Sequence, residues 1–556
     1  MLKYFETILD DRNGSIAAAL LVFVVSCLFY SINLGRAPHP DEIYHILAAR
    51  GLLEYGEPRI ADGLYERVVG YTWLVSRMFA LFGESLAAAR LPSVVAQAVL
   101  NTLLFVWLRR EAGWRTATLA AGLFGVSPFA LEIAQFTRFY ALQSLFFVAG
   151  CLAVYEVTVR PARPGPAAAA RATIRCLVAL ACLAVALYLQ PTTLLGVAGL
   201  GFWLASAVAV PWLADDGVPR RPKILASFLV LVAAATVLAI LLATGIVAEL
   251  WIKFRWVPAF MEPRVNEFWF YHFFYIIYYP TLWPLVGFLS FAALAYRPRV
   301  AWFAMSVFAV GFLLNSVAGP KSLRYMAYAQ PFLFVLLGLG LVATLPWIAS
   351  AGSSLRRQIE THLAAIGLAG WRLPEAMIWG SLAFLLLANA AFLRTVALLA
   401  GITVPPEQPT SQWEAARSSV EALLEEVDVV VTMTELETLY FWGRYDVLFS
   451  PSRLSELDGQ GEFALDYRTG RPVISTREAL ARLVDCTASG LLVTTPSRWR
   501  TPQLIDAETV NFIEQEMTRV DLSPAMQLIV FTWAHAPART AAECAAVREA
   551  LAPGSG

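Results

Sequence analysis

The sequence predicts a polytopic α-helical membrane protein that carries a soluble α/β domain in its last quarter. The chain has 556 residues, of which 58% are hydrophobic and 15% charged, and its mean hydropathy is +0.60. Apolar runs of about 20 residues, the length that spans a bilayer as a helix, recur along the chain. Lysine plus arginine and aspartate plus glutamate balance at 42 each, so no basic field indicates nucleic acid as a partner.

Eleven apolar segments are expected to cross the membrane. The first follows a stretch with both acidic and basic residues, and no small-residue cleavage site comes after it, so we expect a retained helix rather than a signal peptide. The eleven segments are 14 to 34, 87 to 108, 116 to 131, 138 to 158, 174 to 190, 192 to 213, 224 to 247, 269 to 295, 300 to 318, 326 to 348 and 375 to 398.

Segment 67 to 83 is also apolar, but Arg77 interrupts it. If it does not cross, the basic clusters at 109 to 115, 160 to 175, 220 to 223, 297 to 299 and 356 to 372 all fall on the cytoplasmic side, as basic loops usually do. We therefore expect an amphipathic juxtamembrane helix at the outer interface, with Tyr71 and Trp73 at the headgroup level. This topology places residues 35 to 50, 135 to 138, 248 to 268 and 319 to 325 on the outer face of the cytoplasmic membrane.

Two adjacent carboxylates, Asp41 and Glu42, begin a helical pattern in the outer stretch "GRAPHPDEIYHILAAR". The simpler interpretation makes Asp41 the helix N-cap, with Glu42 favouring the helix dipole. In the functional interpretation one carboxylate takes a proton from an acceptor hydroxyl, and its neighbour orients it or helps to hold a divalent cation. His39 and His45 lie nearby, but two scattered histidines do not predict a metal site.

Basic residues on the expected outer face are candidates for binding an anion. Arg138, beside Tyr140, could hold a phosphate through paired hydrogen bonds, whereas the alternative is an arginine that reaches back to the interface. Lys321 and Arg324 share the turn "GPKSLRY", where phosphate binding is favoured over topology marking. The aromatic loop 248 to 268 is either an interfacial anchor or an anion-binding cover, and its basic residues are Lys253, Arg255 and Arg264.

The pattern changes near residue 400, so we expect a membrane domain at 1 to 400, with the first external loop at 35 to 86, and an extracytoplasmic α/β domain at 401 to 556. The runs "VDVVVTM", "YDVLFS", "GLLVTT" and "MQLIVFTW" predict strands, and helical patterns lie between them. No glycine-rich phosphate loop occurs there, so no nucleotide cofactor is expected. Cys486 and Cys544 either form a disulfide or stay free. The aromatic residues 440 to 445 are expected to pack on the membrane domain, with a glycan site as the alternative.

Three stretches together resemble the integral-membrane GT-C glycosyltransferases, in particular the group of protein O-mannosyltransferases and lipid A aminoarabinose and galacturonic acid transferases. The stretches are "PDEIYHILAARGLLEYG", "FGESLAAARLPSVV" and "VSPFALEIAQFTRFYALQSLF". The resemblance covers about residues 14 to 160. Two features depart from the family pattern. The chain has "YERVVGYTW" where relatives carry Pro-Pro-Leu, and Phe136 where they often carry glutamate.

The resemblance implies that a sugar moves from a polyprenyl-phosphate donor in the bilayer to a hydroxyl of a lipid, glycan or protein acceptor, with inversion. Asp41 would act as general base with Glu42 in support, and Arg138, Tyr140, Lys321 and Arg324 would bind the donor phosphate. Loop 248 to 268 would cover the donor. A divalent metal held by Asp41 and Glu42 is left open. The alternatives are a flippase for lipid-linked sugars and a non-catalytic glycan-binding protein of the same fold.

Overall fold

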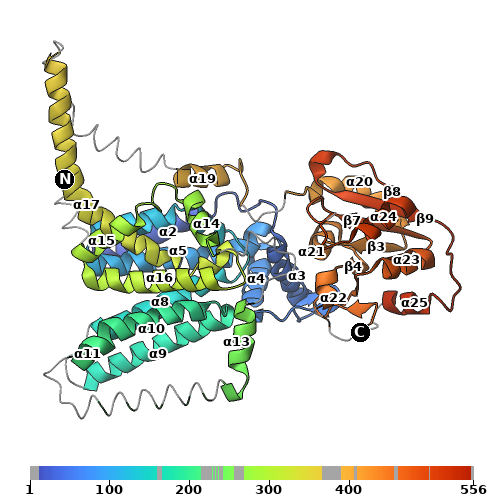
Figure 1. Ribbon diagram of the computed structural model, residues 1–556, viewed down its shortest axis with the longest axis horizontal. Helices are drawn as coiled ribbons and strands as arrows, with labels where there is room; N and C mark the ends of the chain where they lie inside the picture. Colours follow the sequence, from blue (N-terminus) through green and yellow to red (C-terminus); the bar gives the residue numbers. More distant parts are fainter. Residues whose placement is uncertain are drawn as a thin grey trace.

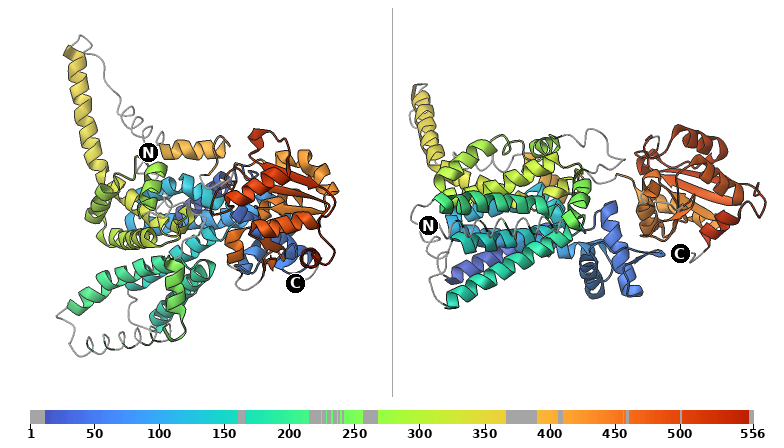
Figure 2. Two further views of the ribbon diagram at one scale, coloured as in Figure 1. Left: turned by 45° about the vertical axis from the view of Figure 1, so that its right-hand side comes forward. Right: turned by 60° about the horizontal axis from the view of Figure 1, so that its bottom comes forward.

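The computed structural model describes residues 12 to 159, 166 to 214, 242 to 255, 268 to 365, 390 to 405, 410 to 455, 461 to 499 and 501 to 552, with isolated positions at 224 to 239 and 457. Long apolar helices lie side by side in one part, and a mixed α/β domain lies at one end of them (Figure 1). Two short helices and a hairpin separate the two parts (Figure 2).

The helical part contains both long and interrupted helices. Its elements are α2 (Arg12–Tyr30), α5 (Leu86–Ala112), α6 (Trp114–Gly125), α7 (Pro128–Ala134), α8 (Tyr140–Val159), α9 (Pro166–Leu189), α10 (Thr193–Leu204), η1 (Ala205–Ala209), α11 (Val210–Ala214), α13 (Ile246–Arg255), α14 (Phe270–Tyr278), α15 (Val286–Tyr296), α16 (Pro298–Val317), η3 (Leu323–Met326), α17 (Gln330–Ala365) and α19 (Ala390–Leu399).

Six helices among the described residues are long and apolar enough to cross a membrane, and a bent pair would make a seventh. These six correspond to expected spans, and expected span 14 to 34 contains the shorter apolar helix Gly14–Tyr30. Two other expected spans are not single straight helices. Segment 116 to 131 bends by 64° between α6 and α7, where Ser127 caps a helix that begins at Pro128. Segment 269 to 295 is divided into α14 and α15 by a stretch with Pro280 and Pro284, because proline removes a helical hydrogen bond. Segments 224 to 247 and 375 to 398 lie largely outside the described residues.

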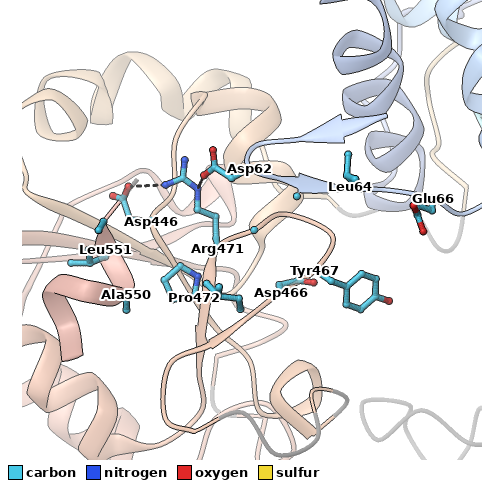
Figure 3. A pocket seen from close by; sticks show the side chains of 14 residues that line it. Asp62, Leu64, Glu66, Asp446, Asp466, Tyr467, Arg471, Pro472, Ala550 and Leu551 are labelled. Atoms are coloured by element: carbon cyan, nitrogen blue, oxygen red, sulfur yellow. Dashed lines mark ion pairs between the residues drawn. The ribbon is translucent and has the colours of Figure 1, made fainter. Parts of the chain in front are cut away.

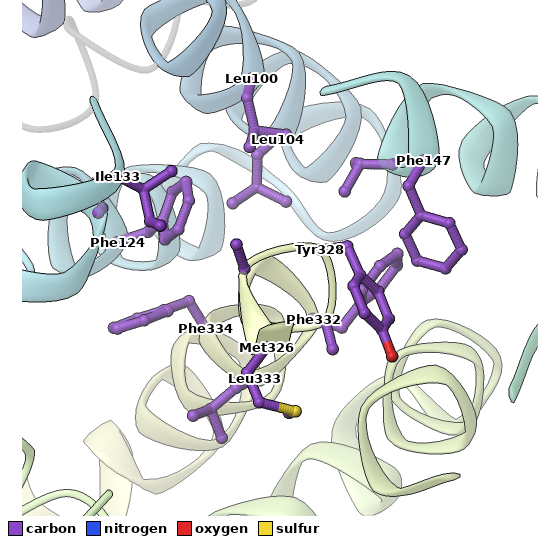
Figure 4. Close-up of a cluster of buried hydrophobic side chains, with 14 of the residues drawn as sticks. Leu100, Leu104, Phe124, Ile133, Phe147, Met326, Tyr328, Phe332, Leu333 and Phe334 are labelled. Carbon is purple, nitrogen blue, oxygen red and sulfur yellow. The ribbon is translucent and has the colours of Figure 1, made fainter. Parts of the chain in front are cut away.

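Apolar side chains from several helices pack together around the start of α17. Leu100 and Leu104 of α5, Phe124 of α6 and Phe147 of α8 surround Tyr328, which lies just before α17 (Figure 4). All of them are at most 1% exposed. Between helices that cross a bilayer, close van der Waals packing of this kind holds the helices together, because lipid tails are as apolar as the core. This core fixes the turn that precedes α17, which carries two of the expected site residues.

The first external loop forms α3 (Pro40–Glu54), the hairpin β1 (Arg59–Ile60) and β2 (Gly63–Leu64), and α4 (Val69–Phe82). With 14 residues, α4 is not among the helices long enough to span, as expected for segment 67 to 83. Trp73 is half exposed, but the expected interfacial position of Tyr71 was wrong. Tyr71 is buried and its hydroxyl lies 2.8 Å from Ser93 Oγ of α5, because the polar end of this ring finds a hydrogen-bond partner inside the fold.

The C-terminal part is a seven-stranded sheet with helices on both faces, and its strand order is β5-β6-β4-β3-β7-β9-β8. Strands β6, β4, β3 and β7 are parallel, and the outer strands are antiparallel. The elements are α20 (Trp413–Glu426), β3 (Val429–Thr432), α21 (Glu435–Glu437), η4 (Thr438–Trp442), β4 (Val447–Phe449), α22 (Pro451–Ser455), β5 (Ala464–Leu465), β6 (Pro472–Ile474), α23 (Arg477–Cys486), β7 (Ser489–Thr494), α24 (Ala507–Glu516), β8 (Thr518–Arg519), η5 (Pro524–Met526), β9 (Ile529–Ala534) and α25 (Ala545–Leu551).

Helices cover both faces of strand β3, which explains why its sequence is continuously apolar. Val429 and Val431 pack with α23, α24 and α25 on one face, whereas Val430 packs with α20 on the other. A strand covered on both faces has no solvent side and needs no polar alternation. Trp442 and Tyr445 belong to the second of these cores, so the expectation that they pack on the membrane domain was wrong. Cys486 and Cys544 form a disulfide.

Candidate functional site

Helix α3 begins with a cap that leaves Asp41 free for other contacts. His39 is the N-cap: its ring Nδ1 accepts from the amide of Asp41 at 3.0 Å, and Glu42 accepts from the His39 amide at 2.9 Å. The expectation that Asp41 is the N-cap was therefore wrong by two positions. Because His39 satisfies the exposed amide, the Asp41 carboxylate can turn away from the helix end. His45 is buried one turn later, hydrogen-bonded to Thr72 Oγ1 at 2.9 Å.

Glu42 holds the first external loop against α5. Arg90 Nε and Nη2 donate to the two Glu42 oxygens at 2.9 and 2.8 Å, and both side chains are at most 1% exposed. The backbone amide of Thr137 donates to Glu42 at 2.8 Å. Burial opposes ionisation of this carboxyl, but Arg90 and the amides lower its pKa to about 2. Glu42 is therefore ionised, and its two oxygens are occupied by Arg90 and by backbone amides. Unlike Asp41, it does not line the cavity described below.

Asp41 faces two arginines from distant parts of the chain. Arg324 Nη1 donates to Asp41 Oδ2 at 2.5 Å, and Arg138 Nη2 lies 4.0 Å from Asp41 Oδ1. Arg138 is anchored by donating to the Asp41 carbonyl at 3.1 Å and to the Tyr65 hydroxyl at 3.0 Å. The Asp41 side chain stays 31% exposed. Although burial opposes its ionisation, the two guanidinium groups hold the pKa of Asp41 well below its usual range.

Of the four residues expected at the donor phosphate, three lie together and one does not. Arg324 lies over the ring of Tyr140, 5.8 Å from its centroid, and over Phe136 at 5.0 Å. Lys321 instead turns into the end of α16, where its Nζ donates to the carbonyls of Asn315 at 3.0 Å and Ser316 at 2.7 Å. A buried ammonium at a helix C-terminus satisfies carbonyls that the helix leaves unpaired, so here Lys321 acts as a cap.

The expected covering loop is described in part. Helix α13 ends at Arg255, which is exposed and lies over the ring of Trp251, 5.8 Å from its centroid. The Phe254 carbonyl accepts from the amide of Gly319 at 2.6 Å, so this helix end touches the turn that precedes Arg324. The side chain of Lys253 and all of Arg264 lie outside the described residues.

The two adjacent carboxylates do not fit a shared divalent cation. Both oxygens of Glu42 accept from Arg90, whereas Asp41 accepts from Arg324, so the pair presents no common set of free oxygen ligands. In the described part of the chain, no group of three or more histidine, cysteine, aspartate or glutamate side chains could hold a metal. Asp41 instead lies beside two positively charged groups, the guanidinium groups of Arg324 and Arg138.

A cavity of about 710 Å³ opens beside Asp41 and is shared by both parts of the protein. Its walls come from α3, from the loop before α4 and from the ends of strands β3, β4 and β7. Its polar lining residues are Asp41, Tyr44, Tyr65, Glu66, Arg67, Arg138, Glu435, Glu437, Ser450, Ser452, Arg453, Tyr467, Arg468, Ser497 and Arg498.

The cavity lies where an α/β sheet usually binds a ligand. The chain passes from β3 to β4 and β6 on one side and then returns to β7 on the other side of β3, so the strand order reverses there. In such sheets the crevice outside the carboxyl ends of the strands at the reversal is the common binding place. Glu437 follows β3 and Arg498 follows β7, so the two flank the reversal point.

The hairpin of the first external loop attaches the C-terminal domain at this place. The amide of Asp62 donates to the Thr469 carbonyl at 3.0 Å, and Arg471 pairs with Asp62 at 2.9 Å. Arg471 points between Asp62 and Asp446 in a second, smaller cavity of about 460 Å³ (Figure 3). The backbones approach so closely that a Cβ on Gly63 would lie 2.5 Å from the Gly470 nitrogen. The domain is therefore attached to the β1–β2 hairpin through backbone contacts and an ion pair.

Sequence reasoning missed Arg90 and Glu437 as parts of the site. Arg90 had a signal, because a lone arginine in an apolar helix that crosses a membrane needs a buried partner. Glu437 had no signal in the local sequence, since "MTELETLYF" shows nothing that distinguishes it from an exposed helical glutamate. Tyr440 packs beside α3, as expected for the aromatic stretch.

No protein-family model and no curated protein matches the sequence. Solved structures are similar over nearly the whole chain. ArnT from Cupriavidus metallidurans bound to undecaprenyl phosphate has a TM-score of 0.58 at 16% identity, covering 95% of this chain and 100% of ArnT. Its apo state has a TM-score of 0.57 at 18% identity, covering 94% and 98%. AglB from Archaeoglobus fulgidus, in complex with an inhibitory peptide and a dolichol-phosphate, has a TM-score of 0.54 at 13% identity, covering 91% and 73%. These proteins are GT-C glycosyltransferases, and the expected GT-C fold is confirmed.

Proposed function

We propose, from the GT-C fold and the two arginines that hold Asp41 at a shared cavity, that this protein is a membrane glycosyltransferase. It transfers a sugar from a polyprenyl-phosphate donor to an acceptor hydroxyl, and Asp41 accepts the proton of that hydroxyl. The observation that carries the proposal is the convergence of Arg324 and Arg138 on a single carboxylate that is 31% exposed. The similar solved structures support the donor class, since ArnT is bound to undecaprenyl phosphate and AglB is in complex with a dolichol-phosphate.

The arrangement suits a donor that carries a monophosphate. In the structure Asp41 neutralises Arg324, and an incoming phosphate would compete for the same guanidinium through charge-assisted hydrogen bonds. As Arg324 turns to the phosphate, Asp41 loses the charge that depresses its pKa and becomes a stronger base. Arg324 and Arg138 then stabilise the charge that develops on the departing phosphate. Donor binding would thus prepare both the leaving group and the base.

In this proposal the acceptor hydroxyl enters through the shared cavity and attacks the anomeric carbon from the side opposite the phosphate, which inverts that carbon. Two observations support an extracytoplasmic position for the cavity. The disulfide between Cys486 and Cys544 is typical of an oxidising compartment, which lies outside the cytoplasm. The basic loops at the other end of the helices are typical of the cytoplasmic side. The cavity and the C-terminal domain would therefore be extracytoplasmic.

The test uses the full chain in lipid nanodiscs with a panel of synthetic polyprenyl-phosphate sugars, and with octyl glycosides and a serine-containing peptide as acceptors. Wild type should transfer at least one sugar, and Asp41→Asn should be slower by about 10²–10⁴-fold, the usual contribution of a general base. Asp521→Asn, on an exposed loop of the C-terminal domain, is the matched control and should keep the wild-type rate. Full activity of Asp41→Asn would refute the assignment. Movement of lipid-linked sugar across vesicles without transfer would favour a flippase instead.

A further inference from the structure

Glu437 is a carboxylic acid of the C-terminal domain that faces the same cavity as Asp41. It is the last residue of α21, directly after β3, and its side chain is 7% exposed. Helix α21 packs against α3: Leu436 belongs to a buried apolar cluster with Ile43 and Leu47 of α3. Packing of the neighbouring Leu436 against α3 thus holds this acid at the cavity.

Among the described residues Glu437 has no ion-pair partner, in contrast to the neighbouring acids Glu435 and Asp41. Glu435 pairs with Arg468 at 3.3 Å, and Asp41 pairs with Arg324 at 2.5 Å. Charged groups that act on Glu437 come from three elements: Arg498 after β7, Glu435 in α21 and Asp41 in α3. The other charged groups that line the cavity are Glu66, Arg67, Arg138, Arg453 and Arg468.

These surroundings place the titration of Glu437 near neutral pH. Burial raises its pKa first, the Glu435 and Asp41 carboxylates add to the rise, and Arg498 opposes it, so the pKa is about 7. An acid with this pKa exchanges a proton readily at physiological pH, whereas Asp41 in its ion pairs does not. The two carboxyl groups line one polar cavity that is large enough to hold several waters.

We propose that Glu437 takes the acceptor proton from Asp41 and passes it to solvent. This role rests on the proposed glycosyl transfer. In the transfer the acceptor oxygen bonds to the anomeric carbon, the bond from that carbon to the phosphate oxygen breaks, and the electron pair leaves with the polyprenyl phosphate. The hydroxyl proton moves to Asp41 and then, through cavity water, to ionised Glu437, which releases it. Glu437 contacts neither the donor nor the acceptor in this scheme. It acts on the reaction through Asp41, by removing the proton that Asp41 has accepted.

The first measurement needs no substrate. Infrared difference spectra of the full chain in nanodiscs, recorded across pH, should show a protonated-carboxyl band that titrates near pH 7. Glu437→Gln should remove that band, and Glu425→Gln, an exposed glutamate of the same domain, should keep it. A band that persists unchanged in Glu437→Gln would overturn the assignment.

The second measurement is the pH profile of kcat for transfer. Because Glu437 must be ionised to accept a proton, the wild-type rate should rise with pH through an apparent pKa of about 7. Glu437→Gln should be slower by about 10-fold or more above pH 7 and should lose this inflection, and Glu437→Asp should restore it in part. A merely structural role would lower the rate equally at every pH and leave the inflection, which would refute the relay while transfer itself stands. Absence of transfer in wild type with every donor would refute the proposed function instead.

Discussion

The buried pair of Arg90 and Glu42 should control the stability of the first external loop. Arg90→Met removes two hydrogen bonds to Glu42 and two more from Arg90 Nη1 to the carbonyls of Leu34 at 2.6 Å and Arg36 at 2.9 Å. It leaves a carboxylate that is 1% exposed with backbone amides as its remaining donors. Breaking one partner of such a buried pair costs about 3–5 kcal/mol, so we expect a loss of that size.

The assay is equilibrium unfolding of the full chain in mixed micelles with increasing SDS, followed by tryptophan fluorescence. Arg77→Met on α4 is the matched control, because Arg77 is exposed and contacts the Trp73 ring 5.6 Å away, an interaction of about 0.5–1 kcal/mol. Adding Glu42→Gln to Arg90→Met should recover part of the loss, since no buried charge is then left unpaired. A loss below about 1 kcal/mol for Arg90→Met, or strictly additive losses in the double variant, would refute this reasoning.

Three further predictions concern parts of the molecule outside the Asp41 contacts. Lys321→Met should lower the free energy of unfolding in SDS by about 1–3 kcal/mol, because the carbonyls at the end of α16 lose their donor. The KM for the donor should not change. A raised KM would show that Lys321 binds the donor phosphate. Replacing both Cys486 and Cys544 by serine should destabilise the C-terminal domain by about 4 kcal/mol, because the bridge closes a separation of 58 residues; an unchanged unfolding midpoint would argue against that bridge. Gly63→Ala should force the hairpin away from Gly470, and hydrogen exchange at the hairpin amides should become faster; protection equal to wild type would contradict the close approach.

The sequence predicts the uninterrupted spans, but not the breaks in two other apolar segments. Helices such as α5, α8 and α16 are long apolar runs, and hydropathy alone locates them. Segment 269 to 295 is also apolar, but its prolines divide it into α14 and α15. Pro280 and Pro284 lie four residues apart. A helix that continued through both would lose a backbone hydrogen bond at each proline.

The candidate site was predictable as a set of residues on one face, but not as a set of contacts. Asp41 and Arg324 are 283 residues apart, and only the packed helices bring them to 2.5 Å. Lys321 and Arg324 lie three residues apart in one turn and look equivalent in sequence. The structure separates them because Lys321 finds carbonyls at the end of α16, whereas Arg324 reaches the carboxylate. The same holds for Asp41 and Glu42, whose roles differ because Arg90 faces one of them alone.

The attachment of the C-terminal domain links its position to the chemistry proposed for Asp41. The hairpin that holds the domain follows α3 directly, and Asp41 lies in the first turn of that helix. Tyr44, one turn further, accepts a hydrogen bond from Arg468, which also pairs with Glu435. Any displacement of the sheet would therefore move Glu435 and Glu437 relative to Asp41 and change the charges that set the two pKa values. An acceptor that binds between the strand ends and α3 would contact both domains, so its binding would stabilise the arrangement in which the two carboxyl groups share one cavity.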